Sequence, residues 1–256
     1  MATFLFDKII FGPVRSRRLG LSLGVNLLLP SAKLCNFNCI YCECGWNADS
    51  PGGAFNDADE VLRRLGEKLT EMKAEGALPD VITFAGNGEP TMHPRFPEII
   101  DGTIAIRDRL APSAKIAVLS NATMIDRPGV REALMKVDRN ILKLDSAVEE
   151  TYRLINQPNT TRLVADTIEL LKLFDGRLII QTLFLRGAYD GRSVDNTTAA
   201  ELGAWLDALR RIRPAEVMVY SIDRDTPASG LEKVPREELE AIAREVHELG
   251  MEVSVA

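Results

Sequence analysis

The stretch Asp80-Val-Ile-Thr-Phe-Ala-Gly-Asn-Gly-Glu-Pro90 joins a short β-rich run to a polar, glycine-containing turn. Its first half is almost continuously apolar, as expected of a strand that is covered on both faces of a sheet. Polar residues follow at once, where the strand ends. The same order, an apolar strand followed by polar residues, returns along most of the chain.

Along the rest of the chain, β-rich runs alternate with helical patterns. Repeated about six times, this alternation predicts an α/β protein with parallel strands joined by right-handed crossovers. Both an open doubly wound sheet and a complete or partial barrel fit the pattern. The expected strands cover residues 22–29, 80–86, 115–121, 140–146, 177–185, 216–222 and 251–255, and the expected helices lie between them from residue 62 to residue 249.

Both architectures bind ligands at the carboxyl ends of their strands. Polar residues gather at these expected ends, which predicts a binding site there. They are residues 87–89, 120–121, 145–146, 186–187 and 223–224.

The composition is that of a globular protein. The 256 residues are 46% hydrophobic and 27% charged, which excludes disordered, collagen-like and disulfide-dense chains. The net charge of −6 argues against a polycation that binds nucleic acid in bulk. Because no apolar run reaches the ~18 residues of a membrane span and no signal peptide is evident, we expect a soluble, cytoplasmic protein with no membrane partner.

All four cysteines, Cys35, Cys39, Cys42 and Cys44, lie within ten residues. Disulfides that stabilise a fold close long loops, so this crowding favours a metal site. Three thiolates on one loop suit an iron–sulfur cluster with one iron left open. The alternative is a structural zinc site that uses Cys44 as well, although its two halves would lie unusually close in sequence.

Two motifs carry a resemblance to a known family. Cys35-Asn-Phe-Asn-Cys-Ile-Tyr-Cys42 resembles the CxxxCxφC signature of the radical S-adenosylmethionine (radical SAM) superfamily, with Tyr41 as the aromatic residue. Gly86-Asn-Gly-Glu-Pro90 resembles the GGEP motif of the same family, with Asn87 at the place of the first glycine. The likeness continues through residues 120–123, 142–146 and 220–223.

The resemblance implies a partial (β/α)6 TIM-like barrel, with one 4Fe–4S cluster and SAM at the carboxyl ends of the strands. Cys35, Cys39 and Cys42 would hold the cluster. An external one-electron reductant would drive cleavage of SAM to a 5′-deoxyadenosyl radical, which abstracts hydrogen from an unidentified small molecule, RNA or protein. A single-cluster electron carrier and a zinc-stabilised binding module are the alternatives; neither needs the GNGEP turn.

The resemblance also implies contacts to SAM. Tyr41 would lie against the adenine or support the loop, and the GNGEP turn would meet the ammonium group. Four polar strand-end residues would contact the carboxylate or the ribose, with Gln181 as a further ribose candidate, although each also suits a hydrogen-bonded loop or cap. The expected SAM contacts are Tyr41, Gly86, Asn87, Gly88, Glu89, Ser120, Asn121, Asp145, Ser146 and Gln181.

The amino-terminal part indicates a branch of the family. Residues 11–26, with 88–94 and 220–227, resemble a group of small Fe–S oxidoreductases related to the archaeal wyosine-tRNA synthases. Those synthases carry further cysteines upstream for a second cluster, and no cysteine precedes Cys35 here, so wyosine chemistry is not inferred.

We expect a single domain over residues 1–256, in which residues 1–33 are a basic segment with the first strand and residues 34–46 are the cluster loop. In the basic segment, Arg15, Arg17 and Arg18 are candidates for gripping an anionic substrate. A solvated or salt-bridged surface segment is the alternative for these arginines.

Overall fold

The computed structural model describes residues 4–16, 19–48 and 55–256. Its central sheet has the strand order β1-β2-β3-β4-β5-β6-β8-β10. Within this order, neighbouring strands from β2 onward are parallel. Strand β1 pairs antiparallel with β2 at one edge. These strands are β1 Ile10–Ser16, β2 Gly20–Val25, β3 Val81–Phe84, β4 Lys115–Ser120, β5 Arg139–Lys143, β6 Ile179–Tyr189, β8 Glu216–Ser221 and β10 Glu252–Val255.

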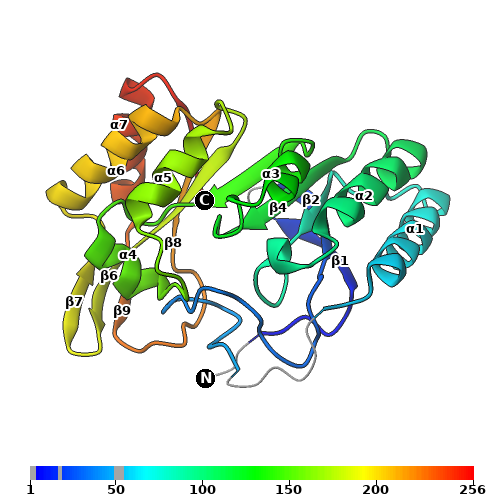
Figure 1. Cartoon of the computed structure of the whole chain (residues 1–256), viewed down its shortest axis with the longest axis horizontal. Helices are drawn as coiled ribbons and strands as arrows, with labels where there is room; N and C mark the ends of the chain where they lie inside the picture. The colour runs from blue at the N-terminus through cyan, green and yellow to red at the C-terminus, as the bar shows by residue number, and fades with distance from the viewer. Residues whose placement is uncertain (1–3, 17–18, 49–54) are drawn as a thin grey trace.

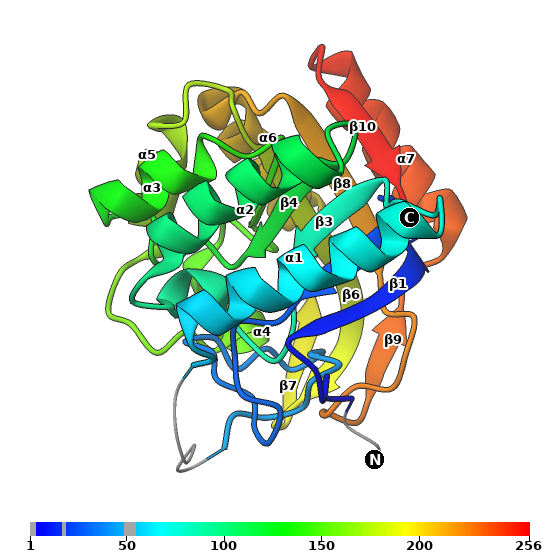
Figure 2. The same cartoon turned by 90° about the vertical axis from the view of Figure 1, so that its right-hand side faces the viewer.

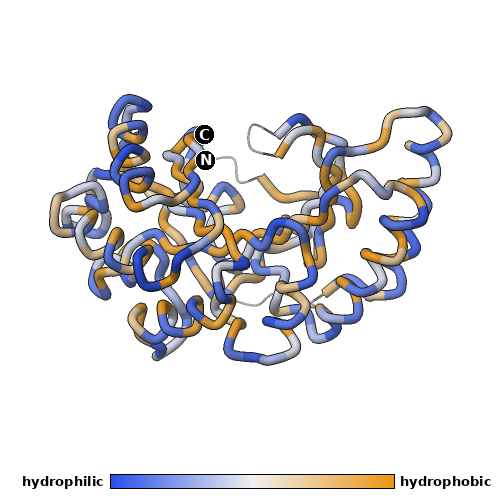
Figure 3. The backbone as a smooth tube through the Cα atoms, turned by 90° about the horizontal axis from the view of Figure 1, so that it is seen from above, coloured by the Kyte–Doolittle hydropathy of each residue, from blue (hydrophilic) through white to orange (hydrophobic). Residues whose placement is uncertain are grey.

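The parallel strands follow one another in chain order, and this order selects between the two predicted architectures. A doubly wound sheet reverses its strand order at a switch point, whereas a barrel adds each strand beside the last. Six parallel strands, β2 to β6 and β8, form the predicted partial TIM-like barrel, and β10 extends it. Seen from above, the backbone curves into a crescent (Figure 3).

Helices cover the outer face of the sheet (Figure 1). In the first of them, Asp57 caps the amino end by accepting hydrogen bonds from the backbone N–H groups of Asp59 and Glu60. Leu65, Leu69 and Met72 form its buried stripe, as their spacing predicts. The helices are α1 Ala58–Ala74, α2 Phe96–Leu110, α3 Pro128–Leu134, α4 Glu149–Asn156, α5 Val164–Lys172, α6 Ala199–Ile212 and α7 Arg236–Glu248, with a short 3-10 helix, η1, at Pro90–Met92.

The two faces of the barrel sheet differ in the size of their buried layers. Alternate residues of each strand point to opposite faces. The helix-facing set, including Leu23, Phe84 and Leu142, belongs to the large core. The inward-facing set is a small separate layer, which consists of Val81, Ala117, Ile141, Ile179 and Met218. The concave side is therefore apolar at its base and leaves room for a site above it.

Several elements were not predicted from the sequence. Strand β1 and helix α4 are additional, and the strand expected at residues 22–29 ends at Val25. The strand expected to end at Leu185 continues to Tyr189, where it pairs antiparallel with β7 Arg192–Asp195 and β9 Leu231–Lys233. Figure 2 shows this extension on the side of the molecule that also holds the loop after β2. These pairings join distant segments, which local periodicity does not reveal.

None of the helices in the described part of the chain has the length and hydropathy of a membrane span.

Candidate functional site

A pocket of about 290 Å³ opens at the carboxyl ends of the barrel strands. The cysteine loop forms one wall, and the ends of β3, β4, β5, β6 and β8 form the rest. All four cysteines line this pocket, although the residues on its other walls, from Gly86 to Arg224, are distant from them in the sequence. Of the residues predicted to contact SAM, the pocket lining includes Tyr41, Gly86, Gly88, Glu89, Ser120, Asn121 and Gln181.

The cysteine loop and the GNGEP turn are joined through their backbones. The N–H of Leu34 donates to the carbonyl of Asn87 at 2.8 Å, and the N–H of Glu89 donates to the carbonyl of Leu34 at 3.1 Å. Gly88 lies between these bonds with φ +140°, and a Cβ there would lie 1.8 Å from the Leu34 carbonyl oxygen. Only glycine allows this approach. The second glycine of the motif thereby fixes the loop to the strand end.

Asn87, at the place of the family's first glycine, has a different role. Its side-chain amide donates to the carbonyls of Phe6 at 2.8 Å and Leu29 at 3.1 Å, and its Oδ1 accepts from the N–H of Phe6 at 2.8 Å. The side chain is fully buried and does not line the pocket. It therefore anchors residues 4–9, which we call the N-terminal segment, in place of a direct contact with a ligand.

Glu89 organises the end of β4. Its Oε1 accepts from the Ser120 hydroxyl at 2.8 Å and from both the N–H and the hydroxyl of Thr91, and its Oε2 accepts from the N–H of Asn121 at 2.7 Å. Burial raises the pKa of this carboxyl above its ordinary value, although the hydrogen bonds act to lower it. The Asn121 amide in turn lies 3.4 Å from the sulfur of Cys35.

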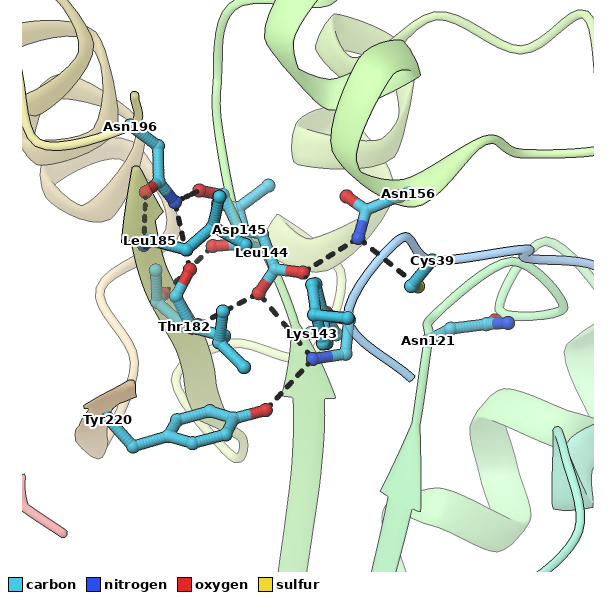
Figure 4. A network of polar contacts seen from close by, with 12 residues as sticks. Cys39, Asn121, Lys143, Leu144, Asp145, Asn156, Thr182, Leu185, Asn196 and Tyr220 are labelled. Atoms are coloured by element: carbon cyan, nitrogen blue, oxygen red, sulfur yellow. Dashed lines mark hydrogen bonds and ion pairs between the residues drawn. The ribbon is translucent and has the colours of Figure 1, made fainter. Parts of the chain in front are cut away.

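Asp145 and Ser146 lie behind the pocket, not on its lining. Asp145 Oδ2 accepts from the Asn156 amide at 2.7 Å (Figure 4). Oδ2 also accepts from the Tyr41 hydroxyl, while Oδ1 accepts from the N–H of Leu183 at 2.9 Å. The Ser146 hydroxyl donates to Glu201 at 2.7 Å. Their polar groups have partners within the protein, where Asp145 orients Tyr41, and their contact with SAM stays a prediction.

The environment of the cysteines differs along the loop. Burial raises the pKa of Cys35 well above its ordinary value and that of Cys39 to about 11. A hydrogen bond from Cys44 lowers the pKa of Cys42 to about 6. Lys33 is buried beside the loop, donates to the carbonyl of Gly45 at 2.8 Å, and favours the thiolates by its positive charge. A cation at this place suits a loop that holds several thiolates.

Comparison with known proteins agrees with this geometry. Residues 29–192, which include the cysteine loop and the ends of β3, β4 and β5, match the family model described as the radical SAM superfamily. The chain belongs to the radical SAM superfamily. The resemblance carried by CNFNCIYC and GNGEP is therefore confirmed.

Relatives of this radical SAM protein include a UPF0026 protein of Helicobacter pylori strain J99, 32% identical over 222 residues, which are 84% of this chain and 67% of that protein. The chain spans 33% to 77% of the lengths of the curated relatives it matches. Among solved structures, a radical SAM methyltransferase from Sphaerobacter thermophilus is similar, with a TM-score of 0.68 at 14% identity, covering 92% of this chain and 65% of that one.

Archaeal TYW1 is also similar, with a TM-score of 0.55 at 13% identity, over 89% of this chain and 71% of that one. At these identities the two structural likenesses show a shared fold.

The residues of the radical SAM loop fit an iron–sulfur cluster. Cys35, Cys39 and Cys42 all line one pocket, and a cluster takes one thiolate per iron.

Arg15, the predicted substrate arginine that the described residues include, does not line this pocket. Arg15 is exposed and pairs with Leu21, at the amino-terminal end of β2 and so at the opposite edge of the sheet. Because β1 runs antiparallel to β2, it carries Arg15 away from the pocket mouth, and binding of an anionic substrate by Arg15 stays a prediction. Arg17 and Arg18 lie outside the described residues.

Three functional residues were missed by sequence reasoning. Lys143 and Tyr220 line the pocket from β5 and β8, and Asn156, from the unpredicted helix α4, lies 3.5 Å from the sulfur of Cys39. The inward register of Lys143 is visible from the sequence, as a charged residue within the otherwise apolar run NILKLDS. The position of Asn156 depends on tertiary packing alone.

Proposed function

We propose that this chain is a radical SAM enzyme that holds one 4Fe–4S cluster on Cys35, Cys39 and Cys42. The observation that carries the proposal is that these three thiols share one pocket with the GNGEP turn. When bound, the cluster and SAM supply one-electron cleavage of the sulfonium C–S bond, giving a 5′-deoxyadenosyl radical that takes hydrogen from the substrate. An external reductant supplies the electron.

The residues of the pocket would orient SAM and supply the polar groups that bind it. The turn at Gly86–Glu89 offers backbone polar groups on the pocket wall for the ammonium group of SAM. Ser120 and Asn121, which Glu89 orients through two hydrogen bonds, offer partners for the SAM carboxylate or ribose. Tyr41 presents its ring to the pocket and is held there by Asp145. Gln181 adds an amide from β6.

The N-terminal segment helps to exclude water from the barrel. The ring of Phe6 stacks on that of Phe11 with centroids 3.7 Å apart, and Phe11 packs against Gly24, where a Cβ would overlap the ring. Phe6 also lines a second, smaller cavity inside the barrel together with Ile141 and Met218. A dry interior protects a reactive radical from stray donors.

Anaerobic reconstitution of the full chain with iron and sulfide tests the proposal. We expect about four irons and four sulfides per chain, and formation of 5′-deoxyadenosine after SAM and dithionite are added. The same treatment of Cys39→Ala is the control. A bound cluster that neither binds nor cleaves SAM would favour an electron carrier, and stoichiometric zinc in place of iron would favour a binding module.

A further inference from the structure

A second cavity, of about 150 Å³, lies inside the barrel beside the pocket that holds the cysteines. Of the described residues, the two cavities share only Leu119 and Gln181 in their linings. An apolar cavity of this volume admits a molecule of about the size of benzene, and S-adenosylmethionine is far larger. This space is therefore separate from the one proposed for SAM. We call it the inner chamber and define it by Phe6, Phe11, Ser22, Thr83, Ile141 and Met218.

The amino-terminal part of the chain walls the inner chamber at an edge of the sheet. Strands β1 and β10 end the strand order, so the described strands leave the barrel open between them. Phe11, on β1, stacks on Phe6 with ring centroids 3.7 Å apart, and Asn87 holds the backbone of Phe6 by two hydrogen bonds. Lining residues from Phe6 to Gly24 precede residues 29–192, which match the family model. This wall is therefore built by a part of the chain outside the matched region.

The lining of the inner chamber is uncharged and mainly apolar. In residues 4–16, 19–48 and 55–256, no Asp, Glu, Lys, Arg or His side chain lines it. Burying an ion without a partner in such surroundings costs far more than burying an apolar group. The hydroxyls of Ser22 and Thr83 are buried and 2.8 Å apart, and the described residues give neither a further partner. Because one of them donates to the other, one O–H hydrogen of the pair is left for an acceptor on a ligand.

We propose that the inner chamber selects a substrate group that is uncharged, mainly apolar, no larger than about benzene, and equipped with one hydrogen-bond acceptor such as a carbonyl oxygen. The assignment rests on the proposed function, since SAM in the adjoining pocket would act on this group. The Ser22–Thr83 pair donates to the acceptor. Phe6 and Phe11 determine specificity, because their rings close the chamber on the open side of the barrel and limit the size and polarity of what enters.

Calorimetric titration of the anaerobic, reconstituted full chain with isobutyramide and with isobutyrate, in the presence and absence of saturating SAM, tests the assignment. The two probes have nearly the same shape, but only isobutyrate is charged. We expect isobutyramide to bind about tenfold more tightly or better, because the chamber offers a charge no partner. Ile141→Phe, which fills the chamber, should weaken isobutyramide binding about tenfold or more. The matched control is Leu173→Phe, on a leucine that is 53% exposed, and it should not change this affinity.

Phe6→Ala tests the wall and does not depend on the folding of Ile141→Phe. Removal of the ring admits water to the chamber, so the preference for isobutyramide over isobutyrate should fall to about threefold or less. Phe4→Ala is the matched control, because Phe4 lies in the same segment but does not line the chamber, and it should keep the preference. Thermal unfolding establishes that each variant is folded.

Four results would overturn the assignment. Equal or tighter binding of isobutyrate would make the substrate class wrong. Wild-type isobutyramide affinity in folded Ile141→Phe would place the probe outside the chamber, and competition between SAM and isobutyramide would assign the space to SAM. An unchanged preference in Phe6→Ala would remove the ring from the wall. Iron content and 5′-deoxyadenosine are measured on the same preparations, so probe binding that needs the chamber in a protein unable to cleave SAM would contradict the proposed function alone.

Discussion

The side chain of Asn87 and the backbone of Phe6 exchange two hydrogen bonds, each 2.8 Å long. This pairing fastens the N-terminal segment to the turn that follows β3, 81 residues further along the chain. The segment also contacts the cysteine loop, since the N–H of Phe4 donates to the carbonyl of Glu43 at 3.1 Å. The motif position that holds glycine in the wider family thus links the start of this chain to its proposed cofactor site.

Replacing Asn87 with alanine should release this segment. The change leaves the N–H of Phe6 and the part-buried carbonyls of Phe6 and Leu29 without their partners, so we expect the free energy of unfolding to fall by about 2–3 kcal/mol. Hydrogen exchange at residues 4–9 should accelerate more than in the barrel strands. Phe4→Ala is the matched control, because Phe4 belongs to the same segment and is 52% exposed. Unchanged exchange in Asn87→Ala would contradict the tether.

Gly88→Ala should displace the cysteine loop from the strand end. The new Cβ would overlap the Leu34 carbonyl, and φ +140° is unfavourable for alanine, so we expect loss of bound iron from a chain that still folds. Iron analysis and circular dichroism measure the two effects. Gly66→Ala, inside α1, is the control: a Cβ there meets nothing within 4 Å, and stability should rise by about 0.5–1 kcal/mol. Equal iron in both variants would rule out this steric role.

The four cysteines should divide into three ligands and one spare thiol. We expect Cys39→Ala to lose the cluster and all formation of 5′-deoxyadenosine, because only two of the three proposed thiolate ligands would remain. Cys44→Ala should keep the iron, since the Cys44 thiol is turned to the carbonyl of Gly86 at 3.4 Å. Iron and sulfide per chain, with 5′-deoxyadenosine yield, measure both variants. Loss of iron from Cys44→Ala would make Cys44 a ligand.

His93 should make stability depend on pH below neutrality. Burial lowers the pKa of this imidazole, whose Nδ1 accepts the Arg95 N–H at 3.1 Å and whose Nε2 lies 2.9 Å from the Asn56 carbonyl. The unfolded chain therefore binds the proton more readily, and the free energy of unfolding should fall as pH drops below about 6.5 toward the lowered value.

Urea unfolding between about pH 5 and pH 7.5 measures this dependence. His93→Gln should reduce the slope in this window. A slope that persists in His93→Gln would assign the proton uptake to another group.

Much of the candidate site follows from local sequence. The cysteine spacing, the GNGEP turn and the polar residues after each strand are adjacent in the chain, so their chemistry can be inferred without a structure. Tyr41, Gly88 and Glu89 do line the pocket, because the ends of neighbouring parallel strands meet at one edge. The contacts of Asp145 behind Tyr41 could not be predicted in this way, because they depend on the neighbouring strand β6 and on helix α4, which periodicity did not reveal.

The sequence alone determined the alternation of strands and helices and the crowding of four thiols on one loop, because both are properties of residues close together in the chain. Tertiary structure decided the barrel over the doubly wound sheet, the position of Arg15 at the far edge, and the meeting of Lys143, Tyr41 and Tyr220. Strand order, strand direction and side-chain register across a curved sheet are set by non-local pairing and packing, which the local pattern of apolar and polar residues does not encode.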